Sequence, residues 1–352
     1  MIFWLYYNVL IKENQAGEGM ANITIKDVAK EAGVSIGTVS NALNGNRYIN
    51  PDTKQRVMDA VKKLNYVPNL NGRYLKAGAT KNLGFFTNSI SGPYFCNLMD
   101  YMCRECERRG YNLNVFITKD SSVIMGNILG KNLDGVLIYE DTTIKENEIR
   151  IFEKEGIKVV FLDREVSKQG VSSILFDSYK AGYEATKHLI NLGHKKIAFI
   201  ECVDEVTDSL RRKEGYKAAL RECNLPVEEK FILKGAFEEE YTYNTIKTIL
   251  KFHSSDLPDA FLAGNDLSAI GCIKALQSDG FQVPEDFSVM GFDDIDIAQY
   301  FTPSLTTVRN PIARQGTLAI DTLVDMIEEK EQGTIVKLEG NLIIRNSCTR
   351  KK

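Results

Sequence analysis

Residues 24–43 read TIKDVAKEAGVSIGTVSNAL, a pattern that predicts two short helices joined by a tight turn. Thr24, with Asp27 three residues later, fits a capping box at the start of the first helix. Gly33 can end that helix in a left-handed conformation, and Ser35 can cap the second helix. The pair is either an ordinary helical hairpin or a helix-turn-helix whose second helix enters the DNA major groove.

A third helix is predicted from about residue 52 to residue 64, where apolar residues recur at helical spacing. Pro51 suits its first turn, where a missing N–H costs no hydrogen bond. This region is also basic, because residues 20–81 carry ten Lys or Arg against four Asp or Glu, whereas the 352-residue chain carries 44 against 47. A basic head on an acidic body is suited to binding nucleic-acid phosphates.

The rest of the chain alternates short apolar strands with amphipathic helices. Strands are expected at residues 83–87, 112–117, 135–139, 159–162, 196–200, 260–263 and 288–291, with helices such as 179–192, 210–223 and 268–280 between them. This alternation predicts an α/β body with parallel sheets covered on both faces. Ligands of such sheets bind beyond the carboxyl ends of the strands.

The sequence contains no catalytic motif, so we expect no enzyme, catalytic residue, metal or cofactor. It has no GxGxxG, P-loop or nucleophile elbow, and its three histidines are His188, His194 and His253. Cys103 and Cys106 lie in a helical pattern without a second pair, which favours structural cysteines over a metal site. Seven cysteines without paired spacing indicate a reducing compartment, and we expect a cytoplasmic protein.

Residues 1–19 differ in character from the rest of the chain. MIFWLYYNVLI is too short an apolar run to span a bilayer and lacks the basic region and cleavage site of a signal peptide. Gly17-Glu18-Gly19 back-translates to purine-rich codons, as a translated ribosome-binding site would. We therefore expect Met20 to be the true start and residues 1–19 to be a non-native extension, with a weak membrane tether as the alternative. Otherwise no membrane partner is expected.

Several motifs in order resemble the LacI family of bacterial transcriptional regulators. DVAKEAGVSIGTVSNALNG, a third helix, LNYVPN and a short segment ending in Leu75 follow one another as in that family. The resemblance continues to about Cys348 through GPYF, FLDR, DSYKAGYEATKHLINLGHKKIAFI, RRKEGYKAAL, GNDLSAIG and GFDDIDIAQYFTPSLTTVRNP.

The resemblance implies a small all-α helix-turn-helix domain followed by two Rossmann-like lobes. The implied parts are residues 20–65 for the DNA-binding domain, 66–80 for a hinge and 81–352 for the effector-binding and dimerisation domain. The N-terminal lobe would comprise residues 81–176 and 308–336, and the C-terminal lobe residues 177–307 and 337–352.

The function implied is that of a homodimeric repressor of sugar-utilisation genes. It would bind double-stranded operator DNA under the control of a small-molecule effector, a sugar or sugar phosphate, held between the lobes. One alternative is a regulator controlled by a phosphorylated carrier protein, as in the catabolite control members of the family. A sugar-binding transport protein is a weaker alternative, because the basic head argues against it.

The resemblance also assigns residues that contact DNA. Ile36, Gly37 and Asn41 occupy the positions that face base edges in the family, where Arg is common in place of Asn41. Asn pairs best with adenine and Arg with guanine. Leu75 stands where a leucine wedges into the minor groove. The full expected set is Thr24, Ser35, Ile36, Gly37, Thr38, Ser40, Asn41, Asn44, Tyr66, Asn69, Arg73 and Leu75.

Seven residues are expected to contact the effector. They are Tyr94, Phe95, Asp163, Arg212, Phe237, Asn265 and Asp293. Their charged and amide groups can bond vicinal hydroxyls, and their rings can stack on an apolar sugar face. Structural roles, such as helix capping or core packing, are the alternative for each. Residues 118–134 are shorter than usual in the family, and ECVDEVTDSLR before Arg212 lacks the usual Gly-rich turn, so pocket specificity does not carry over.

Overall fold

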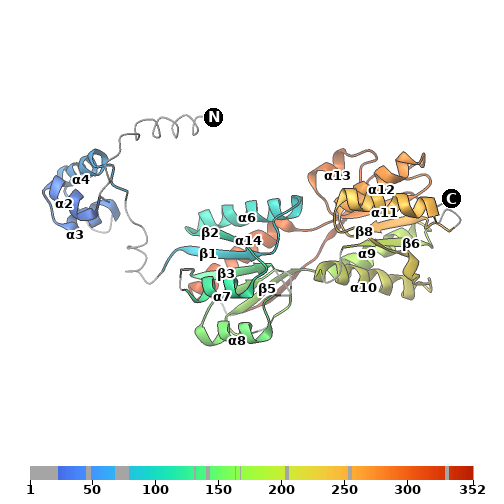
Figure 1. Cartoon of the computed structure of the whole chain (residues 1–352), viewed down its shortest axis with the longest axis horizontal. Helices are drawn as coiled ribbons and strands as arrows, with labels where there is room; N and C mark the ends of the chain where they lie inside the picture. Colours follow the sequence, from blue (N-terminus) through green and yellow to red (C-terminus); the bar gives the residue numbers. More distant parts are fainter. Residues whose placement is uncertain are drawn as a thin grey trace. The chain divides into compact units, whose positions relative to one another are not determined.

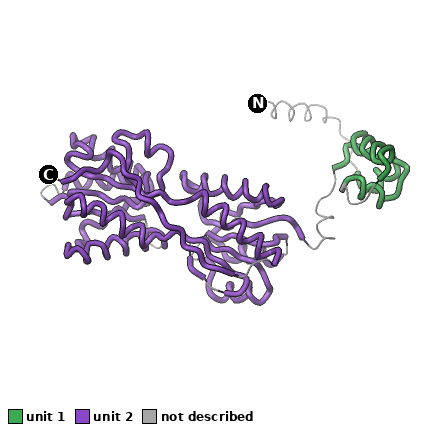
Figure 2. Tube along the Cα trace, turned by 180° about the vertical axis from the view of Figure 1, so that it is seen from behind, with its two compact units in different colours: residues 1–78 green, residues 79–352 purple. Residues whose placement is uncertain are grey.

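The computed structural model of the chain describes residues 23–44, 49–67, 79–130, 132–139, 143–162, 164–166, 168–202, 206–252, 256–329 and 333–351. The expected extension, most of the expected hinge and four expected site residues lie outside the described residues; the four are Asn69, Arg73, Leu75 and Asp163. The side chain of Asn44 is also outside them. The chain divides into two compact units, residues 1–78 and residues 79–352 (Figure 2).

The described part of the first unit contains the three helices that the sequence predicts: α2 (Ile25–Ala32), α3 (Ile36–Asn44) and α4 (Pro51–Lys63). The backbone N–H and the hydroxyl of Thr24 both donate to Asp27 Oδ2, at 2.8 and 2.7 Å. Gly33 ends α2 with φ 65°, a left-handed conformation that glycine adopts without steric cost. Ser35 Oγ accepts the backbone N–H of Thr38 at 3.1 Å and so caps α3.

Small apolar residues hold these helices together. The buried core of the unit is Val28, Ala29, Ala32, Val39, Ala42, Val57 and Ala60. Because four of these seven side chains are alanines, the helices can approach one another closely, and burial of their apolar surface supplies the main stabilisation. This packing leaves the start of α3 outside the core, with Ile36 44% exposed.

The second unit begins with an N-terminal lobe built on a six-stranded parallel sheet in the order β11-β5-β4-β3-β1-β2. Its strands are β1 (Asn82–Thr87), β2 (Asn112–Ile117), β3 (Gly135–Tyr139), β4 (Val159–Phe161), β5 (Val171–Phe176) and β11 (Ile335–Leu338). Helices α6 (Pro93–Arg109) and α14 (Ile312–Ile327) cover one face, and α7 (Ser121–Leu129) and α8 (Glu146–Glu155) cover the other (Figure 1).

The C-terminal lobe has a second six-stranded sheet in the order β12-β10-β9-β8-β6-β7, in which β12 pairs antiparallel with β10. Its strands are β6 (Ile197–Glu201), β7 (Ile232–Lys234), β8 (Ala260–Ala263), β9 (Ser288–Asp293), β10 (Thr306–Arg309) and β12 (Asn341–Ile343). Helices α9 (Ser178–Asn191) and α10 (Thr207–Glu222) cover one face, α11 (Glu239–Phe252) and α12 (Asp266–Ser278) the other, and α13 (Asp296–Tyr300) follows β9 (Figure 1). The predicted α/β class with two parallel-sheet lobes is confirmed.

The chain passes between the lobes three times, after β5, after β10 and after β11. Two of these crossings lie slightly later than the sequence suggests. Strand β10 stays in the C-terminal sheet to Arg309, because it pairs with β9 up to Asp293. Strand β11 stays in the N-terminal sheet to Leu338, because it pairs with β5 up to Phe176.

Candidate effector site and DNA-binding surface

Polar side chains from three neighbouring strands meet at the carboxyl edge of the C-terminal sheet. Asn265 follows β8, Asp293 ends β9 and Asn310 follows β10. Arg212 on α10 reaches the same edge, where its Nη1 donates to the carbonyl oxygen of Gly264 and its Nη2 lies 3.7 Å from Asp293 Oδ1. The structure therefore brings together three of the expected effector residues at the place where such sheets bind ligands.

Arg212 is buried, with 3% of its surface exposed. Its guanidinium carbon lies 4.8 Å from the ring centroid of Phe292, 5.6 Å from that of Phe176 and 5.9 Å from that of Phe237. Stacking on rings offsets part of the desolvation of the cation. Its Nε–H has no hydrogen-bond partner among the described residues. A buried donor without a partner is costly, so this atom is well placed for a ligand.

Asp293 is the carboxylate beside this cation. Burial raises the pKa of Asp293, the charge of Arg212 opposes that rise, and the charge of Asp208 adds to it. A hydrogen bond from Asn310 also lowers the pKa of Asp293. The residue has φ 102°, a conformation that non-glycine residues rarely adopt. Such strained residues concentrate at binding sites.

Asn265 and Phe237 form a connected pair. The side-chain oxygen of Asn265 accepts the N–H of Ser268 at 2.9 Å and caps α12, and its amide donates to the carbonyl of Phe237 at 3.0 Å. Phe237 has φ 60°, and a Cβ on Gly264 would lie 2.8 Å from its ring. The amide of Asn265 is thus engaged within the protein, where it positions Phe237. A direct ligand contact by Asn265 stays a prediction.

The N-terminal lobe contributes a cluster of aromatic rings. Tyr94 and Phe95 lie at the start of α6 and Tyr139 ends β3, with ring centroids 5.1 to 5.8 Å apart. The Tyr94 hydroxyl donates to Gln315 Oε1 at 2.9 Å. Burial raises the pKa of Tyr94 above its ordinary value, and the nearby charges of Asp208 and Asp293 raise that pKa further. The hydroxyl of Tyr94 therefore stays protonated at neutral pH and acts as a neutral hydrogen-bonding group.

Three residues of this region were not predicted from the sequence: Tyr139, Asp208 and Asn310. Asp208 lies one helical turn before Arg212 on α10, and the Tyr139 hydroxyl donates to its Oδ2 at 3.4 Å across the two lobes. Two signals were available in the sequence. Tyr139 closes a predicted strand, and the spacing of Asp208 and Arg212 places both on one helix face.

The DNA-binding head places the expected base-reading positions at its surface. Ile36 and Gly37 at the start of α3 are exposed, and Asn41 one turn later is partly exposed. The Thr24 and Ser35 hydroxyls are used in helix caps, and Tyr66 is half-buried against the core of the head. Whether these residues contact DNA stays a prediction.

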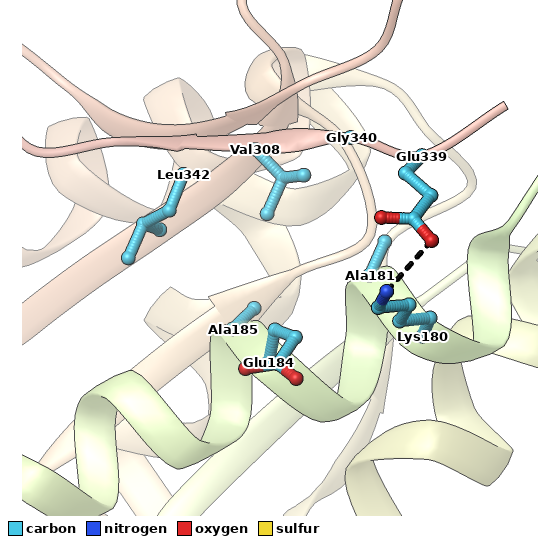
Figure 3. A pocket seen from close by; sticks show the side chains of 8 residues that line it. All are labelled: Lys180, Ala181, Glu184, Ala185, Val308, Glu339, Gly340 and Leu342. Atoms are coloured by element: carbon cyan, nitrogen blue, oxygen red, sulfur yellow. Dashed lines mark hydrogen bonds and ion pairs between the residues drawn. The ribbon is translucent and has the colours of Figure 1, made fainter.

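A small cavity of about 40 Å³ lies elsewhere, between α9 and the strands β10 and β12 (Figure 3). Its lining includes Lys180, whose Nζ lies 2.7 Å from Glu339 Oε1. This volume is close to the roughly 30 Å³ of a single water molecule, so it is too small for a sugar. In the described part of the chain, no group of three or more His, Cys, Asp or Glu side chains is arranged to hold a metal ion. No described helix is long and apolar enough to cross a membrane.

Comparison with known proteins gives a consistent picture. A model of the lacI family of bacterial regulatory proteins matches residues 24–69, and a periplasmic binding protein-like domain model matches residues 186–348. The transcriptional repressor PurR of Histophilus somni is 36% identical over 331 residues, which cover 92% of this chain and 98% of the relative.

Two solved structures extend this likeness. The regulator CelR in complex with cellobiose has 26% identity and a TM-score of 0.68, and the match covers 92% of this chain and 99% of CelR. The lac repressor dimer bound to operator and the anti-inducer ONPF shares the fold, with a TM-score of 0.81 at 22% identity over 94% of this chain and 100% of the repressor. The chain is thus a DNA-binding transcriptional repressor, not an enzyme, and it belongs to the lacI family of bacterial regulatory proteins.

Proposed function

We propose that this repressor binds a two-fold symmetric operator as a homodimer, and that a small polar effector held between the lobes controls that binding. The observation that carries the effector proposal is the buried Arg212, whose Nε–H has no hydrogen-bond partner among the described residues and lies beside the strained residue Asp293. The facing cluster of Tyr94, Phe95 and Tyr139 supplies apolar surface. A few convergent polar groups within an aromatic lining are typical of small-molecule sites.

The favoured effector is a sugar that carries no phosphate group. Arg212 can donate to one of two vicinal hydroxyls and Asp293 can accept from the other, while a ring stacks on the apolar face. Of the described charged side chains at this site, two are carboxylates, Asp208 and Asp293, against one cation, so a sugar phosphate is disfavoured by charge repulsion. The likeness to CelR, solved with cellobiose, supports the same class.

A planar nitrogen base is the second candidate. The aromatic residues Phe95 and Phe237 come from different lobes and could stack on such a ring, and carboxylates accept its N–H groups. The name of PurR, the repressor that is 36% identical to this chain, mentions no sugar, so this likeness does not favour a sugar over a nitrogen base.

The test is fluorescence anisotropy of labelled operator DNA, titrated with a panel of neutral sugars, sugar phosphates, nucleobases and a phosphorylated carrier protein. A sugar without a phosphate group is expected to change operator affinity at micromolar to millimolar concentration. A response to the carrier protein alone would replace this proposal with the alternative regulator.

Base reading by Asn41 is the first prediction. Asn41→Ala is expected to lower specific operator affinity by about 1–3 kcal/mol, because a bidentate contact to adenine N6 and N7 is lost. Selection of binding sites from a random DNA library should show an adenine in the wild-type half-site that the variant no longer prefers. Affinity for unrelated DNA is the control and should stay constant. An unchanged base preference in the variant would contradict the assignment.

The dimer is proposed to form through the edge of the N-terminal sheet. Strand β2 is the edge strand, and two of its apolar side chains, Val115 and Ile117, are exposed beside α6. Ile117 has 55% of its surface exposed. Exposed apolar side chains on an unpaired edge strand favour association with a second copy.

Ile117→Glu is therefore expected to yield monomers in analytical ultracentrifugation and to weaken operator binding by about tenfold or more, since only one half-site is then held. Val123→Glu is the matched control, because Val123 is 43% exposed on α7, which covers the opposite face of the same sheet. If Ile117→Glu still forms dimers and binds operator DNA with wild-type affinity, the dimer interface lies elsewhere.

A further inference from the structure

The carboxylate of Asp208 lies where the two lobes meet. Its Oδ1 accepts the hydroxyl of Ser178 at 2.7 Å. Its Oδ2 lies 3.4 Å from the hydroxyl oxygen of Tyr139, at the outer limit of a hydrogen bond. The first contact belongs to the C-terminal lobe, whereas Tyr139 belongs to the N-terminal lobe.

This carboxylate keeps unused capacity to accept hydrogen bonds. The single proton of the Tyr139 hydroxyl is shared between two acceptors, since Tyr139 also bonds the hydroxyl of Tyr94. An ionised carboxylate has about four acceptor positions, and the described residues supply Asp208 with one short bond and one long one. Among the described residues, its Oδ2 therefore has no short hydrogen bond.

The charge of the site is also unbalanced. Arg212 is the cation beside Asp293, at 3.7 Å, and the negative charge of Asp208 raises the pKa of both Tyr94 and Asp293. Arg309 and Arg345 both donate to Asp294, the residue after Asp293, so their charges are already paired. The described residues at the site thus leave one negative charge without a counter-charge.

The tyrosine whose hydroxyl reaches Asp208 belongs to a cluster of aromatic rings. Tyr139 packs against Tyr94 and Phe95, with centroid separations of 5.8 and 5.1 Å. Aromatic ring faces attract cations, and aromatic rings with a carboxylate form a common site for organic ammonium groups. A neutral hydroxyl gains less from this setting, because it carries no charge to offset that of Asp208.

We propose that Asp208 is a specificity-determining residue that selects an effector with a protonated amino group, namely an amino sugar. The ammonium group would lie against Asp208 Oδ2 and the rings of Tyr94 and Tyr139, while Arg212 and Asp293 bind hydroxyls. This inference rests on the proposed effector site and specifies its ligand more narrowly.

The test is isothermal titration calorimetry of the full chain with three matched pairs: glucosamine and glucose, galactosamine and galactose, mannosamine and mannose. At least one amine is expected to bind about tenfold or more tightly than its neutral partner, because a charge-assisted hydrogen bond replaces a neutral one. Asp208→Asn should remove that preference, so that each amine and its neutral partner bind with affinities within about twofold of each other. Asp208→Glu should retain part of the preference.

Glu214→Gln is the matched control. Glu214 lies on the same helix but is exposed and paired with Arg211 at 2.9 Å, so its neutralisation should leave the amine preference unchanged. Thermal melting of each variant checks that the chain is folded. Failure of all three amines to bind, or an equal preference in wild type and Asp208→Asn, overturns the inference. If a neutral sugar still releases operator DNA, only this inference fails; if no small molecule acts, the proposed effector site fails with it.

Discussion

Arg212→Met is expected to bind operator DNA with wild-type affinity and to lose its response to the effector. Methionine keeps the buried aliphatic volume among Phe176 and Phe292 but removes the guanidinium that lies 3.7 Å from Asp293. An effector shifts an equilibrium only through a difference in its affinity for two states. Without this contact the coupling itself is lost, whereas the separate DNA-binding unit is untouched.

The stability of this variant should depend on pH in a defined direction. Loss of Arg212 leaves the buried Asp293 without its counter-charge, at a cost of about 3–5 kcal/mol when the carboxylate is ionised. Burial already raises the pKa of Asp293, and removal of the cation raises that pKa further. Because the folded state then binds the proton more tightly than the unfolded state, unfolding free energy should fall as pH rises from about 4 towards the raised pKa.

The double variant Arg212→Met with Asp293→Asn separates the loss of effector response from the loss of folding stability. It removes both charges, so the unfolding free energy should recover and lose this pH dependence, while the effector response should stay absent. Chemical denaturation at pH 5 and pH 8 and operator anisotropy with and without effector provide the two readouts. A normal effector response in Arg212→Met would remove Arg212 from the site.

Gly215→Ala is expected to destabilise the body by separating two of its helices. Helices α9 and α10 touch through their backbones, so that a Cβ on Gly215 would lie 2.1 Å from the carbonyl oxygen of Tyr179 and 2.7 Å from the backbone nitrogen of Tyr183. A Cβ on Gly182 would lie 2.2 Å from the carbonyl oxygen of Arg212. Because backbone atoms cannot rotate away, the helices must separate, at a cost of about 1–3 kcal/mol or more.

The same substitution should weaken effector binding, because α10 carries both Arg212 and Asp208 to the site. Denaturant unfolding and calorimetry measure the two effects. Gly126→Ala is the matched control: Gly126 lies in α7 with open space around its Cβ position, so alanine should stabilise that helix by up to about 1 kcal/mol. Equal stability of Gly215→Ala and wild type would mean that α9 and α10 do not pack this closely.

The head and many of the strands could be predicted from the sequence, because their signals are local. The caps formed by Thr24 with Asp27 and by Ser35 with Thr38 span three residues, and Gly33 ends its helix through its own backbone conformation. Strand β5 was not predicted. Its Ser172 is buried and its hydroxyl accepts the backbone N–H of Thr334, 162 residues away. Because the hydrogen-bond partner of Ser172 lies in a distant segment, the local sequence shows a polar residue and no hydrophobic strand pattern.

The proposed effector site also depends partly on local sequence signals and partly on tertiary contacts. Motif resemblance predicts Arg212 and Asp293 as effector contacts, but their proximity depends on α10 and β9, which are far apart in the chain. The hydrogen bond between Tyr139 and Asp208 joins residues 69 positions apart in different lobes, and no periodicity connects them. Helix caps and strand alternation depend on residues that are neighbours in the sequence, so the sequence alone predicts them. The charge balance of the site depends on which side chains the fold brings together, and only the tertiary structure decides that.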